Sequence, residues 1–530
     1  MKVTGVILDI MGIQNYITNS NRLKLIAAGS GIVEHVYSQD FLTQAMKKTS
    51  LGPQIALDWR NSQELLITKG DIQAETAYIG GGNALLLFKD PEIAKEFCRS
   101  WTLQILEQFP TLQPIAACYT ADDFDPENTS QFIINCHAEL ANAKAQYFRN
   151  NDLPRYGVTA ECTESGASAG LYHCFEERGS NQYYSSAIAV KYKIYANGLV
   201  DKNLAAKLSQ SDSQLKFPVE FDTIGGVQTR EKNGADSGRS SIAVVHIDGN
   251  ALGKKFQSIE SLKDYRQLSV YVEELFTNAM GKVIDELKDN KDIRENLHIK
   301  NNLLPIRPII FGGDDVTYVC HGQIGLWTVE RFLTYLRELQ STGSDLITAC
   351  AGIVITKPNY PFSRAYEIAE DLCKSAKDAV PNSDKSALDF HILKGGVLNK
   401  VEDLRKDVYQ TACDSLVGRP LIFDWDTSYR RLKKGAQEIA SKWPNSKIKQ
   451  IREMIFLGEA SLNQFLVHCE RQGNIIKERP EYSIRLKSGQ DKDRDRKPIP
   501  TWLDLCEFLD IYPPWLLTDS RDSKNTGGAQ

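Results

Sequence analysis

The chain has 530 residues, 42% of them hydrophobic, and a formal net charge of −5, which is compatible with three or four domains that bury large cores. This charge argues against general electrostatic affinity for nucleic acid or an anionic membrane, although a local basic groove is compatible with it. No apolar run reaches membrane-spanning length and the N-terminus lacks a signal-peptide pattern, so we expect a cytoplasmic protein. The eleven cysteines are scattered, which favours buried thiols over a disulfide framework.

The N-terminal part predicts a strand ending at Asp9 and a hairpin over 77–88. The turn of this hairpin contains Gly80, Gly81 and Gly82, followed by Asn83. Glycines adopt positive φ without steric cost and leave room for a ligand to approach the backbone. A helix, an apolar strand and a second helix are expected to follow, over 91–109, 114–119 and 137–147.

The region 122–239 contains dispersed metal-ligand residue types but no CxxC pair. A tetrahedral zinc set is conceivable from Cys162, His173, Cys174 and either Cys136 or His137. Zinc sites usually have closely spaced ligand pairs, so we regard zinc as doubtful here. The glycine-rich stretch 225–238 is expected to be a mobile loop.

A second strand–turn–helix pattern begins at Ser241, where an apolar strand ends in Asp248, Gly249 and Asn250. A helix is expected to start near Ala251. A carboxylate at the end of a strand, followed by small residues and a helix N-terminus, is suited to hold a metal and to let backbone N–H groups meet phosphate oxygens.

The hairpin over 309–319 carries Gly312 and Gly313 as its expected turn and then Asp314 and Asp315. Adjacent carboxylates repel each other and resist burial unless a cation lies between them. Rigid oxygen ligands of this kind suit Mg²⁺ or Mn²⁺. The alternative is a solvated turn, since Gly and Asp are common turn residues.

A β–α–β–β unit with a helix over about 264–287 would bring Asp248 close to this hairpin, because the first strand and the hairpin turn are neighbours in that topology. After the hairpin we expect a helix over 323–339, a strand over 346–356 and a second helix over 365–380. This last helix carries Lys377, which we expect either to reach a phosphate or to lie in solvent. Ser386 and Asp389 are weaker candidates for orienting the nucleotide or the hairpin.

The two halves share one element order, so we interpret them as copies of a βαββαβ unit rather than unrelated α/β segments. The first copy has Gly82 and Asn83 where the second has Asp314 and Asp315, and has lost the paired carboxylates. The expected fold class is α+β, with two ferredoxin-like palm domains, a small intervening domain and a C-terminal helical bundle. The first helix of this bundle is expected over 401–415. The expected boundaries are 1–121, 122–239, 240–398 and 399–517, where 122–239 includes the last helix of the first palm, followed by a disordered tail over 518–530.

The order of these motifs over about 150 residues resembles the large subunit of type III CRISPR effector complexes, whose palm is related to GGDEF-type nucleotide cyclases and polymerases. The resemblance implies that ATP is converted to cyclic oligoadenylates, with ATP bound between a degenerate palm and an intact one. It also implies assembly with guide RNA, target RNA, small helical subunits and backbone RNA-binding subunits. Many members begin with a nuclease domain carrying a His-Asp pair; this chain has no such dipeptide, so we expect no DNA cleavage.

In this interpretation two Mg²⁺ or Mn²⁺ ions are held by Asp248, Asp314 and Asp315. Gly249 and Asn250 would shape the triphosphate cradle, and Gly312 and Gly313 would let the substrate lie against the turn. Lys377 would reach a phosphate, and the first palm would bind nucleotide through Gly80 and Gly81. Three alternatives stay open: a mononucleotide or dinucleotide cyclase, a free-standing signal synthase, and a non-catalytic scaffold subunit.

Overall fold

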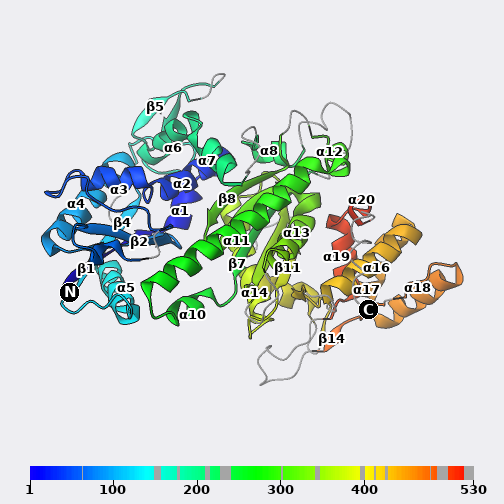
Figure 1. Ribbon diagram of the computed structural model, residues 1–530. Helices are drawn as coiled ribbons and strands as arrows, with labels where there is room; N and C mark the ends of the chain where they lie inside the picture. The colour runs from blue at the N-terminus through cyan, green and yellow to red at the C-terminus, as the bar shows by residue number, and fades with distance from the viewer. Residues whose placement is uncertain are drawn as a thin grey trace. The chain divides into compact units, whose positions relative to one another are not determined.

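The computed structural model describes residues 1–61, 64–147, 157–175, 179–208, 215–226, 240–299, 303–340, 346–393, 400–410, 414–423, 428–477, 479–485 and 499–517. Their contacts divide the chain into two compact units (Figure 1). Unit 1 comprises Met1–Gln214, Ala251–Thr277 and Ile309–Asp315, and unit 2 comprises Leu215–Asn250, Asn278–Pro308 and Val316–Gln530. No described helix has both the length and the apolar character needed to cross a bilayer.

Unit 1 is built on a four-stranded antiparallel sheet in the order β2-β3-β1-β4. Side chains of β1 (Val3–Met11) alternate between two cores, since Val6 and Leu8 belong to one hydrophobic cluster and Val3 and Ile7 to the other. The sheet is therefore covered on both faces, which explains why this strand is apolar at almost every position.

The elements of unit 1 follow the predicted order. The strands of its main sheet are β1, β2 (Ala74–Gly80), β3 (Asn83–Phe88) and β4 (Gln113–Ala121), and its helices are α1 (Ile13–Ile17), α2 (Leu23–His35), α3 (Gln39–Met46), η1 (Leu66–Thr68), α4 (Pro91–Gln108) and α5 (Ser130–Gln146). A small subdomain adds β5 (Leu171–His173), β6 (Gln182–Tyr184), α6 (Ser186–Ala196) and α7 (Leu199–Leu208). Unit 1 also contains α10 (Leu252–Gln257) and the first part of α11 (Leu262–Asp289).

The sheet of the second palm has six strands in the order β13-β11-β10-β7-β9-β8. Its strands β8-β9-β7-β10 repeat the order β2-β3-β1-β4 of the first sheet. The registers also agree, because Leu8 pairs with Ala84 and Ala116, whereas Ile247 pairs with Val316 and Ala351. The predicted α+β class with two palm sheets is confirmed, and the shared register supports duplication of one unit.

The second palm and the segments around it contain these elements: α8 (Phe221–Ile224), β7 (Ile242–Gly249), α12 (Lys291–Asn296), β8 (Ile306–Gly312), β9 (Asp315–His321), η3 (Gly322–Ile324), α13 (Gly325–Glu338), β10 (Ala349–Thr356), α14 (Phe362–Asp378) and β11 (Ala387–Ile392). Helix α14 packs closely on β10, since a Cβ at Gly352 would overlap the carbonyl oxygen of Ala369. Only glycine fits at this crossing.

The C-terminal region is mainly helical, as predicted, but one part of the prediction is wrong. Residues 401–415 do not form one helix: α15 (Val401–Leu404) passes into a π-helical turn, η4 (Arg405–Tyr409), and Asp414–Ser415 form strand β12. The next strand, β13 (Leu421–Ile422), extends the palm sheet by pairing with β11, with Leu421 buried and Ile422 partly buried there. The remaining elements are α16 (Ser428–Lys442), α17 (Asn445–Leu457), α18 (Glu459–Arg471), β14 (Ile484–Arg485), α19 (Trp502–Ile511) and α20 (Pro514–Leu517).

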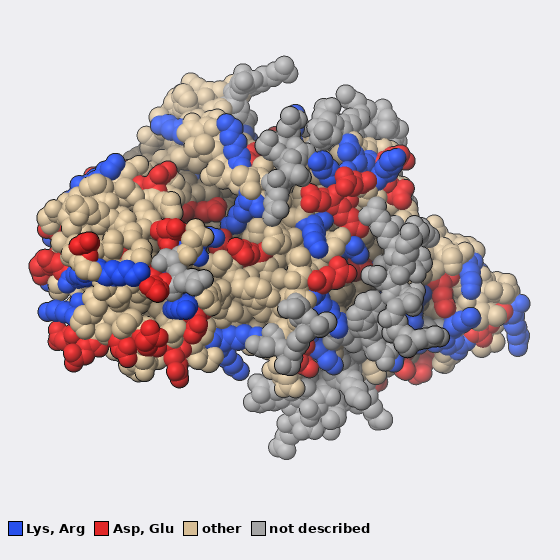
Figure 2. All heavy atoms as spheres, viewed as in Figure 1, with Lys and Arg blue, Asp and Glu red and all other residues tan. Residues whose placement is uncertain are grey.

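The expected mobile loop, 225–238, lies mostly outside the described residues, as do the expected tail 518–530 and residues 394–399 at the end of the second palm. On the face shown in Figure 2, basic and acidic side chains are interspersed. This distribution agrees with the near balance of charges in the sequence.

Candidate active site

The centre of the candidate site is an ion pair between Asp248, near the end of β7, and Lys377, in the last turn of α14. The Lys377 Nζ atom donates to Asp248 Oδ2 at 2.6 Å and to the carbonyl oxygen of Gly249 at 2.9 Å. Both side chains keep about a third of their surface exposed, 31% for Lys377 and 37% for Asp248. Burial lowers the pKa of Lys377, but the hydrogen bond and charge of Asp248 outweigh it and leave that pKa raised.

Lys377 reaches this place because α14 is amphipathic and closely packed. Its apolar stripe, which includes Ile368, Leu372 and Ala376, is buried against the sheet. One turn from the helix end, Ser375 donates a hydrogen bond to Asp389 on β11 at 3.0 Å. The helix is thus fixed two residues before the lysine, and the charged head of Lys377 lies over the end of β7.

The hairpin β8–β9 is confirmed, but its turn is one residue later than expected. The turn residues are Gly313, with φ of 63°, and Asp314, whereas Gly312 ends β8 and Asp315 begins β9. The two carboxylates are half-buried rather than buried. A Cβ at Gly312 or Gly313 would meet nothing within 4 Å, so the backbone of the turn is open on that side.

Strand pairing relates this turn to Asp248. Ile247 on β7 pairs with Val316 on β9, and the strands are antiparallel. Asp248 follows Ile247, and Asp315 precedes Val316, so the same register, continued by one step, sets the two aspartates opposite each other just beyond the last pair. The predicted closeness of Asp248 to the hairpin turn is therefore a consequence of the pairing of β7 with β9.

Among the described residues, no group of three or more His, Cys, Asp or Glu side chains is arranged to hold a metal ion. The convergence of three carboxylates on two ions therefore stays a prediction. The donor chemistry fits, since carboxylate oxygens are the ligands that Mg²⁺ and Mn²⁺ take, and the ammonium group of Lys377 already occupies a cation position against Asp248. Zinc also stays doubtful: Cys136 and Cys162 lie in the separate hydrophobic clusters of α5 and of the small subdomain.

The structure gives Asn250 and Ser386 roles in holding the backbone. The Asn250 side chain is 5% exposed and donates to Thr348 Oγ1 at 2.8 Å and to the carbonyl of Lys385 at 3.0 Å. Ser386 Oγ accepts a hydrogen bond from the backbone N–H of Ala349 at 3.3 Å. Asn250 thereby joins the end of β7 to the segments before β10 and β11, and Ser386 joins the starts of β10 and β11 to each other. Asn250 Oδ1 finds no hydrogen-bond partner in the described part of the chain.

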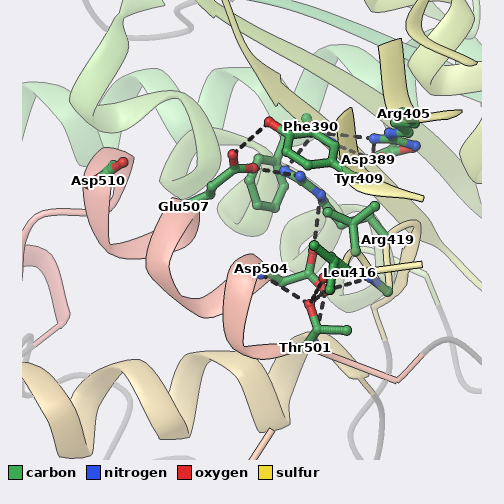
Figure 3. Close-up of polar contacts among 12 residues, drawn as sticks. Asp389, Phe390, Arg405, Tyr409, Leu416, Arg419, Thr501, Asp504, Glu507 and Asp510 are labelled. Carbon is green, nitrogen blue, oxygen red and sulfur yellow. Dashed lines mark hydrogen bonds and ion pairs between the residues drawn. The ribbon is translucent and has the colours of Figure 1, made fainter. Parts of the chain in front are cut away.

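Asp389 belongs to a buried polar network rather than to an open site (Figure 3). Its carboxylate has no exposed surface and accepts two hydrogen bonds from Arg405, at 2.7 and 2.8 Å. Nearby, the buried guanidinium of Arg419 stacks on Phe390 and pairs with Glu507 at 2.6 Å. Removing one partner of such a buried pair typically costs about 3–5 kcal/mol, so this network fixes β11 against α19.

The first palm carries an equivalent ion pair. Lys144 on α5 donates to Asp9 Oδ2 on β1 at 2.8 Å, and Asp9 pairs with Asn83 in the sheet. Burial raises the pKa of Asp9, and the hydrogen bond from Lys144 offsets only part of this. The hairpin turn has φ of 58° at Gly81 and 78° at Gly82. Asn83 Oδ1 is buried and finds no hydrogen-bond partner among the described residues.

One residue next to the hairpin was missed by sequence reasoning. Lys207 on α7 donates to the carbonyl oxygen of Phe311 at 2.9 Å, directly before Gly312. Its ammonium group also lies 3.3 Å from Glu34 and 3.8 Å from Glu273. Because its partner at the hairpin is a backbone atom, no motif could have revealed it.

Comparisons with known proteins agree with this geometry. Residues 241–387 match the family model described as Cas10/Cmr2, second palm domain. A solved Csm1–Csm4 cassette in complex with cA4 aligns with a TM-score of 0.54 at 13% identity, covering 97% of this chain and 70% of that chain. Csm1 from T. onnurineus aligns with a TM-score of 0.54 at 13% identity, covering 96% and 69%. A Csm1–Csm4 subcomplex of the type III-A CRISPR-Csm interference complex gives 0.52 at 13%, covering 97% and 70%. No curated protein sequence matches the chain.

The repeated strand order and the matched segment define a protein with two palm-type sheets, the second of which lies in the matched segment. Residues 241–387 are similar to the second palm domain of Cas10/Cmr2, and the predicted resemblance to the large subunit of type III CRISPR effector complexes is confirmed.

Proposed function

We propose that the protein is a nucleotidyltransferase that joins ATP molecules into cyclic oligoadenylates, with the chemistry on the second palm. The observation that carries this proposal is the ion pair of Asp248 with Lys377 at the end of β7, one step beyond the strand pair that leads to Asp315, inside the segment that matches the Cas10/Cmr2 second palm. Further support comes from solved structures of similar fold that are described as complexes with cA4 and with pppApApA.

The residues that would hold Mg²⁺ or Mn²⁺ are Asp248, Asp314 and Asp315. When bound, these ions would lower the pKa of the attacking ribose hydroxyl and balance charge on the departing pyrophosphate. The chain's own contribution is to hold the carboxylates at the end of one strand pair, so that little reorganisation is needed when a nucleotide binds.

The other residues of the site act on the substrate by position and charge. Gly312 and Gly313 leave the turn open, so the triphosphate can lie against the backbone. Lys377 orients Asp248 in the free protein, and its partly exposed ammonium group can also donate to a phosphate oxygen. Asn250 holds the segment that follows β7, and Ser386 holds the start of β10.

We assign ATP binding without catalysis to the first palm. Its turn leaves space at Gly81, where a Cβ would meet only the Asn83 side chain, at 4.0 Å. The unpartnered Asn83 Oδ1 supplies a polar contact, and the Asp9–Lys144 pair supplies a cation near the end of β1. Two bound ATP molecules would turn a bimolecular encounter into an oriented one.

The proposed setting is an RNA-guided type III complex with guide RNA, target RNA and further protein subunits. The similar Csm1 chains are described in cassettes with Csm4 and in a type III-A interference complex, which supports this setting. A free-standing synthase of the same fold is the main rival, because the residues of the site are compatible with either.

The test is to incubate the purified protein with ATP and Mg²⁺ or Mn²⁺, alone and with RNA-guided partner subunits, and to analyse the products by mass spectrometry. Cyclic oligoadenylates are expected. Labelled ATP and GTP supplied together distinguish the proposal from a mononucleotide or dinucleotide cyclase, which would yield cyclic mono- or dinucleotides. Absence of any nucleotide product in every mixture would leave the scaffold alternative.

A further inference from the structure

Two cysteines of unit 1 lie in contact although they are distant in sequence. Cys98 is on α4 and Cys118 is on the edge strand β4, and their Sγ atoms are 3.3 Å apart. Both residues are partly exposed, unlike the fully buried Cys136 behind the same sheet. They are therefore in contact with each other and within reach of a small reagent.

The packing of α4 on β4 explains why the two thiols meet. Cys98 and Cys118 both lie against the hydrophobic cluster that contains Phe97 and Trp101, so each side chain is held on the face where helix and strand touch. A disulfide requires the Sγ atoms to approach by roughly 1.3 Å more than the 3.3 Å that separates them.

We propose that Cys98 and Cys118 form a redox modification site, in which a hydroperoxide converts the two thiols to a disulfide that joins α4 to β4. The site is separate from the nucleotide chemistry of the second palm, and nothing in the proposed function requires it.

The environment assigns different roles to the two sulfurs. The hydrogen bond from Cys98 lowers the pKa of Cys118; burial opposes this and the positive charge of Lys95 assists it. The same hydrogen bond, together with burial, raises the pKa of Cys98. Cys118 is therefore the thiolate that reacts first, because the thiolate is the nucleophile, and Cys98 is the resolving thiol.

The reaction balances in two steps. The Cys118 thiolate attacks one peroxide oxygen, the O–O bond breaks, and the leaving alkoxide takes a proton to become an alcohol, or water when the oxidant is hydrogen peroxide. Cys118 is left as a sulfenic acid. Cys98 then loses its proton and attacks the Cys118 sulfur, the S–O bond breaks, and hydroxide leaves as water. The two sulfurs together lose two electrons, which the peroxide receives.

The test uses the full-length protein treated with a small excess of hydrogen peroxide, followed by digestion without reductant and mass mapping. The expected result is a cross-linked peptide pair containing Cys98 and Cys118, lighter by two hydrogen atoms and lost on treatment with dithiothreitol. Cys174→Ser, which removes a similarly exposed cysteine of the small subdomain, should leave the cross-link unchanged.

A sulfenic-acid trapping reagent distinguishes the roles. Cys98→Ser should accumulate trapped label on Cys118, whereas Cys118→Ser should give at least tenfold less label on Cys98. Each variant is first checked for native circular dichroism and an unchanged elution volume. Absence of the cross-link in folded wild-type protein would overturn the site, and trapped label on Cys98 instead of Cys118 would overturn the assignment of roles.

Discussion

The two palms share a scaffold but differ at the hairpin tip. In both, an aspartate near the end of the central strand pairs with a lysine near the end of a following helix: Asp9 with Lys144 and Asp248 with Lys377. In the first palm Asn83 pairs with that aspartate, and in the second palm Asp315 lies at the corresponding position. The aspartate–lysine pair is therefore common to both palms, and the tip carboxylates are what distinguishes the palm to which we assign catalysis.

The largest effect is expected from removing those tip carboxylates. Replacing Asp314 and Asp315 together by Ala should reduce product formation below detection. Thermal stability should be equal or higher, because two adjacent half-buried carboxylates repel each other in the metal-free protein. The control is Asp378→Ala with Asp384→Ala, which removes the same charge from exposed positions in the same palm. Product formed by the tip double variant would remove the active site from this hairpin.

A bulky side chain in the first palm tests whether that palm contributes a nucleotide. Gly81→Trp should block product formation, although every proposed metal ligand is intact, because the indole occupies the space that we assign to ATP. The substitution also strains a residue at φ 58°, so Gly52→Trp, at φ 70° in an open loop, is the matched control for strain and bulk. Full activity of folded Gly81→Trp protein would reduce the first palm to a scaffold.

The central aspartates can be compared directly by isosteric changes. Asp248→Asn should slow the reaction by about a hundredfold or more, as loss of a charge that stabilises the transition state typically does. Nucleotide affinity without metal should hardly change. Asp9→Asn in the first palm should slow the reaction by no more than about tenfold, since we assign no chemistry there. A normal rate and normal metal dependence in Asp248→Asn would show that Asp248 is not one of the metal ligands.

A substitution at Lys207 tests whether its hydrogen bond to Phe311 positions the hairpin. Lys207→Met removes a charge-assisted hydrogen bond to the backbone before Gly312, which is worth about 1.5–3 kcal/mol, and should lower kcat roughly tenfold. Lys207→Arg should restore part of this loss. Lys202→Met, on the exposed side of the same helix, should have no effect. Equal rates for both methionine variants would show that the contact does not position the hairpin.

The smallest effect concerns pH. The pKa of Lys377 is raised above its ordinary value of 10.5, so the stability that it contributes is fully present below pH 10.5 and is lost as pH rises through the folded-state pKa. The difference in free energy of unfolding between wild type and Lys377→Gln should therefore shrink above pH 10.5, by less than about 1 kcal/mol because the pair is partly exposed. A difference that stays constant across this range would contradict the pairing with Asp248.

The sequence was sufficient to predict the two palm sheets, since alternation, glycine turns and repeated element order all point to one fold. It also predicted from strand order that Asp248 lies near the hairpin that carries Asp314 and Asp315. The ion pair of Lys377 with Asp248 was not predicted, because the helix pattern left Lys377 either near a phosphate or in solvent. The sequence did not predict contacts to backbone carbonyls, because such contacts leave no motif. Examples are the hydrogen bonds from Lys207 to Phe311 and from Asn250 to Lys385. The short strand β13 escaped prediction because its strand character comes from pairing with β11.

Asp389 illustrates a different failure. A carboxylate close to a candidate nucleotide site suggests a contact with substrate, but this one is fully buried and paired with Arg405. The arginine lies 16 residues further along the chain, in a π-helical turn that the sequence pattern did not predict. Its contribution to the site is indirect, through the hydrogen bond from Ser375 that fixes α14.

The most direct test of the division between a binding palm and a catalytic palm is to measure bound ATP and product in the same protein. Equilibrium dialysis with labelled ATP is carried out on the Asp314→Ala, Asp315→Ala protein with and without Gly81→Trp, alongside mass analysis of the products. We predict that the tip variant still binds ATP but makes no product, and that adding Gly81→Trp reduces the amount of ATP bound. Product from the tip variant, or ATP binding that Gly81→Trp leaves unchanged, would contradict the account.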